Sequence, residues 1–184
     1  KRIWLCPYKV DTMQYMFMNS IFTSGLEGQY NTTGNLGSPR INRIFINRQD
    51  HSQFIFTDPY SYFITPVNQF HFTNTLSPFT ILNYNTGGGS SNGEDHFKAI
   101  FGVNAGRKLG VGFKFDYLYG RGFYNNQSSA HFNYTMYGSY LGEQYQAHLL
   151  LSTNHQKNAE NGGITNDGYI TTPEAYNEDY STNE

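Results

Sequence analysis

The chain has 184 residues, which is enough for one domain, and its net charge of -2 argues against a nucleic-acid-binding surface, which would be basic and clustered. Only 14% of the residues are charged, whereas 17% are aromatic and 19 are glycines. This composition is typical of β structure, because aromatic side chains suit a pleated surface and glycine supplies turns. The single cysteine, Cys6, excludes an internal disulfide and a cysteine-based zinc site, and no apolar run reaches the ~18 residues of a transmembrane helix.

The first 78 residues form an irregular N-terminal region for which the sequence predicts only short strands. These strands are expected over 11–24, over 41–48 after a turn at Gly37-Ser38-Pro39, and over 53–75. Pro59 and Pro66 interrupt the last of these ranges, and proline is confined to the edges and ends of strands. The region is therefore not a clean series of long strands.

From residue 79 onward, apolar and polar residues alternate with a period of two. The alternation predicts five strands, over 79–86, 96–105, 109–119, 131–140 and 145–153. Long polar loops (87–95 and 120–130) alternate with tight turns (106–108 and 141–144). Residues 154–184 are polar and without a period, so they are predicted to be a long loop or a truncated end.

These two regularities indicate an all-β fold, an antiparallel up-and-down transmembrane β-barrel. Strands in a soluble sheet average 5–6 residues, whereas a tilted strand of about 9–11 residues crosses a bilayer. Short turns on one side of the membrane and long loops on the other are typical of such barrels. The sequence thus predicts a transmembrane β-meander over 79–153, with residues 1–78 plugging the barrel, lying at its rim or lying on the periplasmic side. A soluble, lipocalin-like barrel fits the same alternation if its apolar face turns inward.

The alternation assigns each residue of the meander to one of two faces. The polar face is predicted to line a pore, with Lys98, Lys114, Asp116, Asn133, Thr135, Gln146, His148 and Ser152. The apolar face is predicted to meet lipid, with Phe101, Val103, Val111, Phe113, Phe115, Met136 and Leu149. An aromatic girdle at the membrane interface is predicted from Tyr117, Tyr119, Tyr140 and Tyr145.

No motif for catalysis, metal binding or cofactor binding emerges from the sequence. The six histidines do not form an HExxH motif or another metal-ligand spacing. The glycine-rich GGGSSNG at 87–93 lacks the GK[ST] ending of a phosphate-binding loop, and no GxSxG elbow is present. We therefore expect no enzymatic activity, no metal and no cofactor.

Three stretches resemble the putative porins of Bacteroidetes, a family of outer-membrane β-barrels. They are GNLGSPRINRIFINR (34–48), YNTGGGSSNGEDHFKAIFGVNAGRKLGVGFKFDYLYGRGFYNNQSSAHFN (84–133) and STNHQKNAENGGITNDGYI (152–170). The resemblance implies the outer membrane of a Gram-negative bacterium and a diffusion channel. Members of the family are longer, and such barrels usually end in a strand with a terminal aromatic residue. Because this chain ends NEDYSTNE, we expect it to be the N-terminal part of a larger barrel.

The expected function is the passage of small hydrophilic solutes through an outer-membrane barrel. Its partners would be outer-membrane lipid and those solutes, with further copies of the chain or other membrane proteins as candidates for assembly. One alternative is a non-conducting scaffold barrel in an outer-membrane assembly, with its lumen plugged by residues 1–78. A soluble barrel that binds an apolar ligand is the other alternative, and it would stay in solution without detergent.

Overall fold

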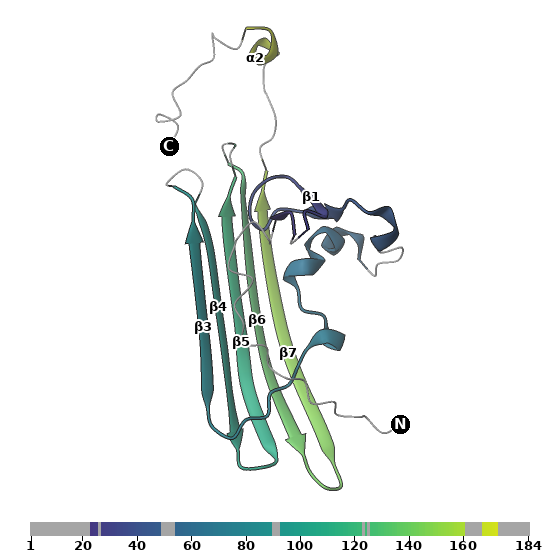
Figure 1. Ribbon diagram of the computed structural model, residues 1–184, viewed down its shortest axis with the longest axis vertical. Coiled ribbons are helices and arrows are strands. Elements are labelled where there is room, and N and C mark those ends of the chain that lie inside the picture. The colour runs from purple at the N-terminus through teal and green to yellow at the C-terminus, as the bar shows by residue number, and fades with distance from the viewer. Residues whose placement is uncertain are drawn as a thin grey trace.

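The computed structural model describes residues 23–25, 27–48, 54–89, 93–122, 124, 126–160 and 167–172. Within these residues the chain forms two antiparallel sheets, several short 3-10 helices and one short α-helix (Figure 1). The elements before the main sheet are β1 (Tyr30–Thr32), β2 (Arg40–Asn42), η1 (Phe45–Asn47), η2 (Ile55–Phe63) and η3 (Val67–Gln69). The main sheet and the helix after it are β3 (Phe79–Gly87), β4 (Glu94–Ala105), β5 (Leu109–Arg121), β6 (Ser128–Leu141), β7 (Gln146–Ala159) and α2 (Gly168–Thr171).

The main sheet is a five-stranded antiparallel meander in which each strand pairs with the next along the chain, in the order β3-β4-β5-β6-β7. The long strands run side by side in Figure 1, joined alternately at the two ends of the sheet. Its four later strands have 12 to 14 residues, well above the length usual in soluble sheets. Within the described residues the sheet is open, with β3 and β7 as its edges.

All five predicted strands are present, and each of them extends further at one end or both than the alternation indicated. The largest difference is in β7, which was expected to end at residue 153 but continues to Ala159. Its added part pairs with the beginning of β6, from Asn133↔Asn154 to Ser128↔Ala159. Backbone pairing continues there because ladder hydrogen bonds use main-chain groups, which polar side chains on both faces do not prevent.

The tight turns lie where the sequence placed them. Gly106, between β4 and β5, has a φ of 75°, a left-handed conformation that glycine adopts without steric cost. Between β6 and β7, the amide of Gly142 donates to the carbonyl of Tyr145 at 2.8 Å. These two turns lie at the same end of the sheet, where β3 begins.

The predicted strands of the N-terminal region are largely wrong. The turn at Gly37-Ser38-Pro39 is present, with a φ of 80° at Gly37. However, the strand predicted over 41–48 ends at Asn42 and is followed by η1, and the strands predicted over 53–75 are the 3-10 helices η2 and η3. The strand predicted over 11–24 falls almost wholly outside the described residues.

Local hydrogen bonds explain these corrections. The side-chain oxygen of Asn42 accepts from the amide of Ile44 at 2.8 Å, a bond that turns the chain where a strand would have to continue. In η2, Pro59 has no N–H to give to a sheet ladder, and short-range bonds such as Thr57 N–H to the Phe54 carbonyl at 3.1 Å hold the helix.

Buried residues such as Leu36, Leu118 and His131 lie between the main sheet and the described residues of 30–78, which we call the covering segment. Leu36, Leu118 and Tyr137 are the buried apolar residues among those described, and they are outnumbered by buried polar ones such as His131 and Ser129. In Figure 1 the covering segment descends along the sheet from β1 to the start of β3. No helix in the described part of the chain is long and apolar enough to cross a membrane.

Candidate functional site: the polar face and the segment that covers it

The strand register divides the main sheet into a polar face and an aromatic face. One row across the polar face contains Lys98, Asp116, Asn133 and Asn154, and the next contains Ile100, Lys114, Thr135 and Ser152. All eight residues that the sequence predicted to line a pore lie on this face. Six of them are in these two rows, and the other two, Gln146 and His148, lie near the beginning of β7. Whether they line a pore stays a prediction; their common face is a property of the fold.

The aromatic face carries all the residues predicted to meet lipid. Its rings stack across neighbouring strands. Phe113 lies 5.6 Å from Phe101, its direct partner on β4, and 6.2 Å from Tyr134, a diagonal neighbour on β6, measured between ring centroids. Phe97 and Phe115 form a second contact at 5.8 Å. The other predicted lipid-facing residues and three of the predicted interface tyrosines occupy the same face: Val103, Val111, Met136, Leu149, Tyr117, Tyr119 and Tyr140. Tyr145 lies in the turn before β7 and is 76% exposed.

The covering segment is anchored near the long-loop end of the sheet by the turn at residues 35–38. The side-chain amide of Asn35 donates to the Gly120 carbonyl at 3.3 Å and to the Ser129 hydroxyl at 3.0 Å. Leu36 is 0% exposed and lies so close to Gly120 that a Cβ there would be 2.2 Å from the Leu36 carbonyl oxygen. The glycine in β5 is therefore what allows the two backbones to approach.

His131 lies at the centre of this anchor and is 0% exposed. Its Nε2 donates to the Gly37 carbonyl at 2.6 Å, so the hydrogen is on that nitrogen. Phe63 of η2 stacks on its ring at a centroid distance of 4.5 Å and an interplanar angle of 21°. The histidine therefore joins two parts of the covering segment to β6.

Contacts in the middle of the polar face involve the residues predicted to line a pore. Lys114 Nζ donates to the Thr65 hydroxyl at 3.2 Å, and the side-chain amide of Asn133 donates to the Phe63 carbonyl at 2.9 Å. The cavity left between these groups measures only about 10 Å³, which is room for about one water molecule. At this level the covering segment packs directly against the sheet.

The acidic residue of this cluster, Asp116, has a partner that the sequence did not indicate. Its Oδ1 lies 2.9 Å from Nε2 of His96 on the neighbouring strand, an ion pair when the histidine is protonated. The sequence had indicated only that Asp116 shares the polar face with residues such as Lys114. Cross-strand diagonal neighbours are within reach of long side chains, which is how His96 meets the carboxylate.

Near the tight-turn end, Tyr137 receives the last part of the covering segment. Its hydroxyl is 2.9 Å from the Thr73 hydroxyl, and Phe70 and Phe72 pack edge-on against its ring at 5.2 and 6.0 Å. The ring also lies over Gly112, where a Cβ would be 2.5 Å from the tyrosine oxygen. Glycines on this face therefore make room for the tyrosine and the segment.

Sequence reasoning missed the residues that dock the segment, namely Asn35, Leu36, His131 and Tyr137. The sequence feature that marks this docking surface is the glycines of the polar face. At four of them, a Cβ would lie within 3.0 Å of another group: Gly102, Gly110, Gly112 and Gly120. Glycine within a strand often marks a site where another backbone approaches closely.

The chemistry of this site is that of solvation and charge. The described residues contain no group of three or more His, Cys, Asp or Glu side chains that could hold a metal ion. Lys98, Lys114 and Asp116 provide charges of both signs beside amide and hydroxyl groups. Such a surface interacts with water and polar solutes without forming a covalent bond.

Comparison with protein families matches residues 5–184 of the chain to a family described as "Putative porin". Neither a curated protein nor a solved structure matches the chain.

Proposed function

The chain belongs to the family of putative porins, and from that premise we propose that its sheet is part of an outer-membrane β-barrel through which small hydrophilic solutes pass. In this proposal the aromatic face meets lipid and the polar face surrounds an aqueous lumen. The covering segment lies inside that lumen and narrows it. No catalytic step is involved.

The observation that supports the proposal is the separation of the two faces over five long strands. The hydrogen bonds and ring contacts that join the covering segment to the strands lie on the polar face. Apolar side chains on the other face are left exposed, including Met136 at 50% and Leu149 at 61%. A large exposed apolar surface is unusual for a soluble protein, and lipid would cover it.

A barrel in lipid must pair the backbone groups along both edges of this sheet. Each unpaired group in the hydrocarbon region costs several kcal/mol, so the edges of β3 and β7 need partner strands. The described residues do not supply such strands. The proposal therefore includes further strands that close the barrel.

Conductance tests the proposal directly. The protein, purified in detergent, is added to a planar bilayer under a salt gradient, and the reversal potential gives its ion preference. We expect stepwise currents whose preference shifts toward cations when Lys114→Glu places a negative charge on the polar face. Lys108→Glu is the matched control, because Lys108 is an exposed residue of the tight turn between β4 and β5.

Equal shifts from the two variants would contradict the assignment of the polar face to the lumen. A protein that remains soluble without detergent would contradict the membrane location and favour the soluble ligand-binding barrel.

A second function, a non-conducting scaffold barrel, is favoured by how closely the covering segment fits the polar face. The cavity of about 10 Å³ at Lys114 leaves no room for a hydrated solute between the segment and the strands at that point. If the segment stays in place, the barrel is closed on this side. A folded wild-type protein without current would support the scaffold.

Releasing the segment distinguishes the two functions. Gly120→Ala introduces a Cβ that would meet the Leu36 carbonyl at 2.2 Å, so the anchor must shift. A channel narrowed by the segment should then gain conductance per open event, whereas Gly138→Ala, with its nearest neighbours 3.9 Å away, should leave the conductance unchanged. Currents absent from the wild type and from Gly120→Ala alike would leave only the scaffold.

A further inference from the structure

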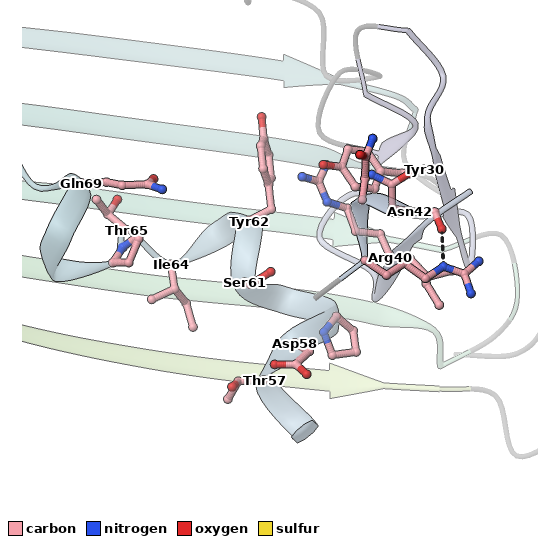
Figure 2. A pocket seen from close by; sticks show the side chains of 15 residues that line it. Tyr30, Arg40, Asn42, Thr57, Asp58, Ser61, Tyr62, Ile64, Thr65 and Gln69 are labelled. Atoms are coloured by element: carbon pink, nitrogen blue, oxygen red, sulfur yellow. Dashed lines mark hydrogen bonds between the residues drawn. The ribbon is translucent and has the colours of Figure 1, made fainter. Parts of the chain in front are cut away.

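A cavity of about 760 Å³ lies within the covering segment, between the β1–β2 pair and η2. Figure 2 shows Tyr30, Arg40 and Asn42 on one side of it and Asp58, Ser61 and Tyr62 on the other. Its size falls within the range of ~300–1,000 Å³ that is usual for small-molecule sites. No part of the proposed passage mechanism uses it.

Arg40 is the unusual residue of this cavity. It is only 8% exposed, and its guanidinium carbon lies 3.8 Å from the ring centre of Tyr30 and 3.4 Å from that of Tyr62. Burial lowers the pKa of the Arg40 guanidinium from its ordinary value, while Tyr30 and Tyr62 oppose that shift, and burial raises the pKa of the Tyr62 phenol. Tyr30 and Tyr62 contact the cation through the faces of their rings.

The charge of Arg40 has no counter-ion among the described residues. Its Nη1 is buried and makes no hydrogen bond to any of them, and they supply no carboxylate in an ion pair with it. Tyrosine faces stabilise a cation by less than the desolvation of the ion costs. Arg40 thus lines the cavity with a buried guanidinium donor that is unpaired, and an anion bound beside it would supply the missing counter-ion.

The rest of the lining suits the same kind of ligand. A second guanidinium, that of Arg48, borders the cavity. Its Nε donates a hydrogen bond to the carbonyl of Asn42 at 2.8 Å (dashed in Figure 2). Two arginines against the single carboxylate of Asp58 leave the lining with a net positive charge. Amide and hydroxyl donors complete it: Asn42, Asn47, Thr57, Ser61, Thr65 and Gln69.

We propose that this cavity binds the carboxylate or phosphate group of a small anionic solute, with Arg40 as the principal donor. The inference rests on the proposed function only where it places the site on a solute's route. That placement comes from Thr65, which borders both this cavity and the contact with Lys114 on the polar face. Binding itself needs only the folded protein.

Thermal unfolding of the protein in detergent tests the site without any measurement of current. A ligand that binds the folded state raises Tm in a saturable way. Inorganic phosphate and succinate are titrated separately, at constant ionic strength, with methyl glucoside as a neutral probe. We expect a saturable increase with at least one anion, and the anion that acts identifies phosphate or carboxylate as the group recognised.

Three variants assign the effect to the cavity. Arg40→Gln should weaken binding by about 10–100-fold, since it removes a charged hydrogen-bond donor. Arg48→Gln, at an exposed position, should weaken anion binding by about threefold. It replaces Arg40→Gln as the test variant if Arg40→Gln does not fold. Arg43→Gln should have no effect, because Arg43 is an exposed residue that bonds Asn31 and does not line the cavity.

Three results would overturn the site: no saturable response to either anion, an equal response to methyl glucoside, or an equal loss in Arg43→Gln and Arg48→Gln. Conductance separates this failure from that of the proposed function. A protein that conducts without binding an anion refutes the cavity alone, and one that binds an anion without conducting refutes the channel alone.

Discussion

The main sheet and the covering segment are held in place by different kinds of contact. Backbone ladders join the five strands residue by residue, from Phe79↔Gly102 at one edge to Gln146↔Leu141 at the other. The covering segment has one short pair of strands, β1 and β2, and otherwise meets the sheet through individual side chains such as His131 and Lys114. The sheet therefore tolerates most single side-chain changes, whereas the segment depends on a few of them.

The largest effect is expected on the aromatic face, at Phe113. If this face meets lipid, Phe113→Arg places a charge near the bilayer midplane and should lower the free energy of unfolding by ~2–4 kcal/mol. Urea unfolding of the protein in phosphatidylcholine vesicles measures this cost.

The matched change lies one residue along the strand. Lys114 lies on the polar face, so Lys114→Glu should lower the free energy of unfolding by less than half as much in the same vesicles. Comparable losses from the two substitutions would contradict the assignment of the faces.

An intermediate effect is expected where the segment touches the sheet most closely. Gly120→Ala forces the Leu36 backbone away, and overpacking of this kind costs about 1–3 kcal/mol. Limited proteolysis should then cut the covering segment faster while the strands stay protected. Gly138→Ala on the aromatic face is the control, and a segment that stays equally resistant in both variants would show that Gly120 is not its anchor.

A smaller effect is expected at the tight-turn end. Tyr137→Phe removes the hydroxyl that bonds the Thr73 hydroxyl at 2.9 Å and the Phe101 carbonyl at 3.4 Å, and it keeps the ring contacts with Phe70 and Phe72. One neutral hydrogen bond contributes about 0.5–1.5 kcal/mol, so the variant should unfold at slightly lower urea concentration. Hydrogen exchange should be faster at residues 70–75 and unchanged in β6; faster exchange throughout the sheet would mean that Tyr137 stabilises the strands themselves.

Local pattern predicted the strands well and the covering segment poorly. Between Phe97 and Leu151 each strand keeps a period of two with few exceptions, such as Ile100 and Leu118 on the polar face, and the strands, their order and their faces agree with the structure. At Asn42 and Pro59 the same approach failed, because a side-chain hydrogen bond and a missing backbone N–H turned the chain away from the predicted strands. The polar face was identified residue by residue, but its partners were not.

The sequence by itself determined the meander of long strands, the two faces and the positions of the tight turns, since alternation and turn residues act over a few positions. Only the tertiary structure decided what lies on the polar face. His131 meets Gly37 across 94 positions of the chain, and Asp116 pairs with His96 on another strand. Such contacts depend on which surfaces fit together, and a glycine such as Gly120 marks an open position without naming the residue that will occupy it.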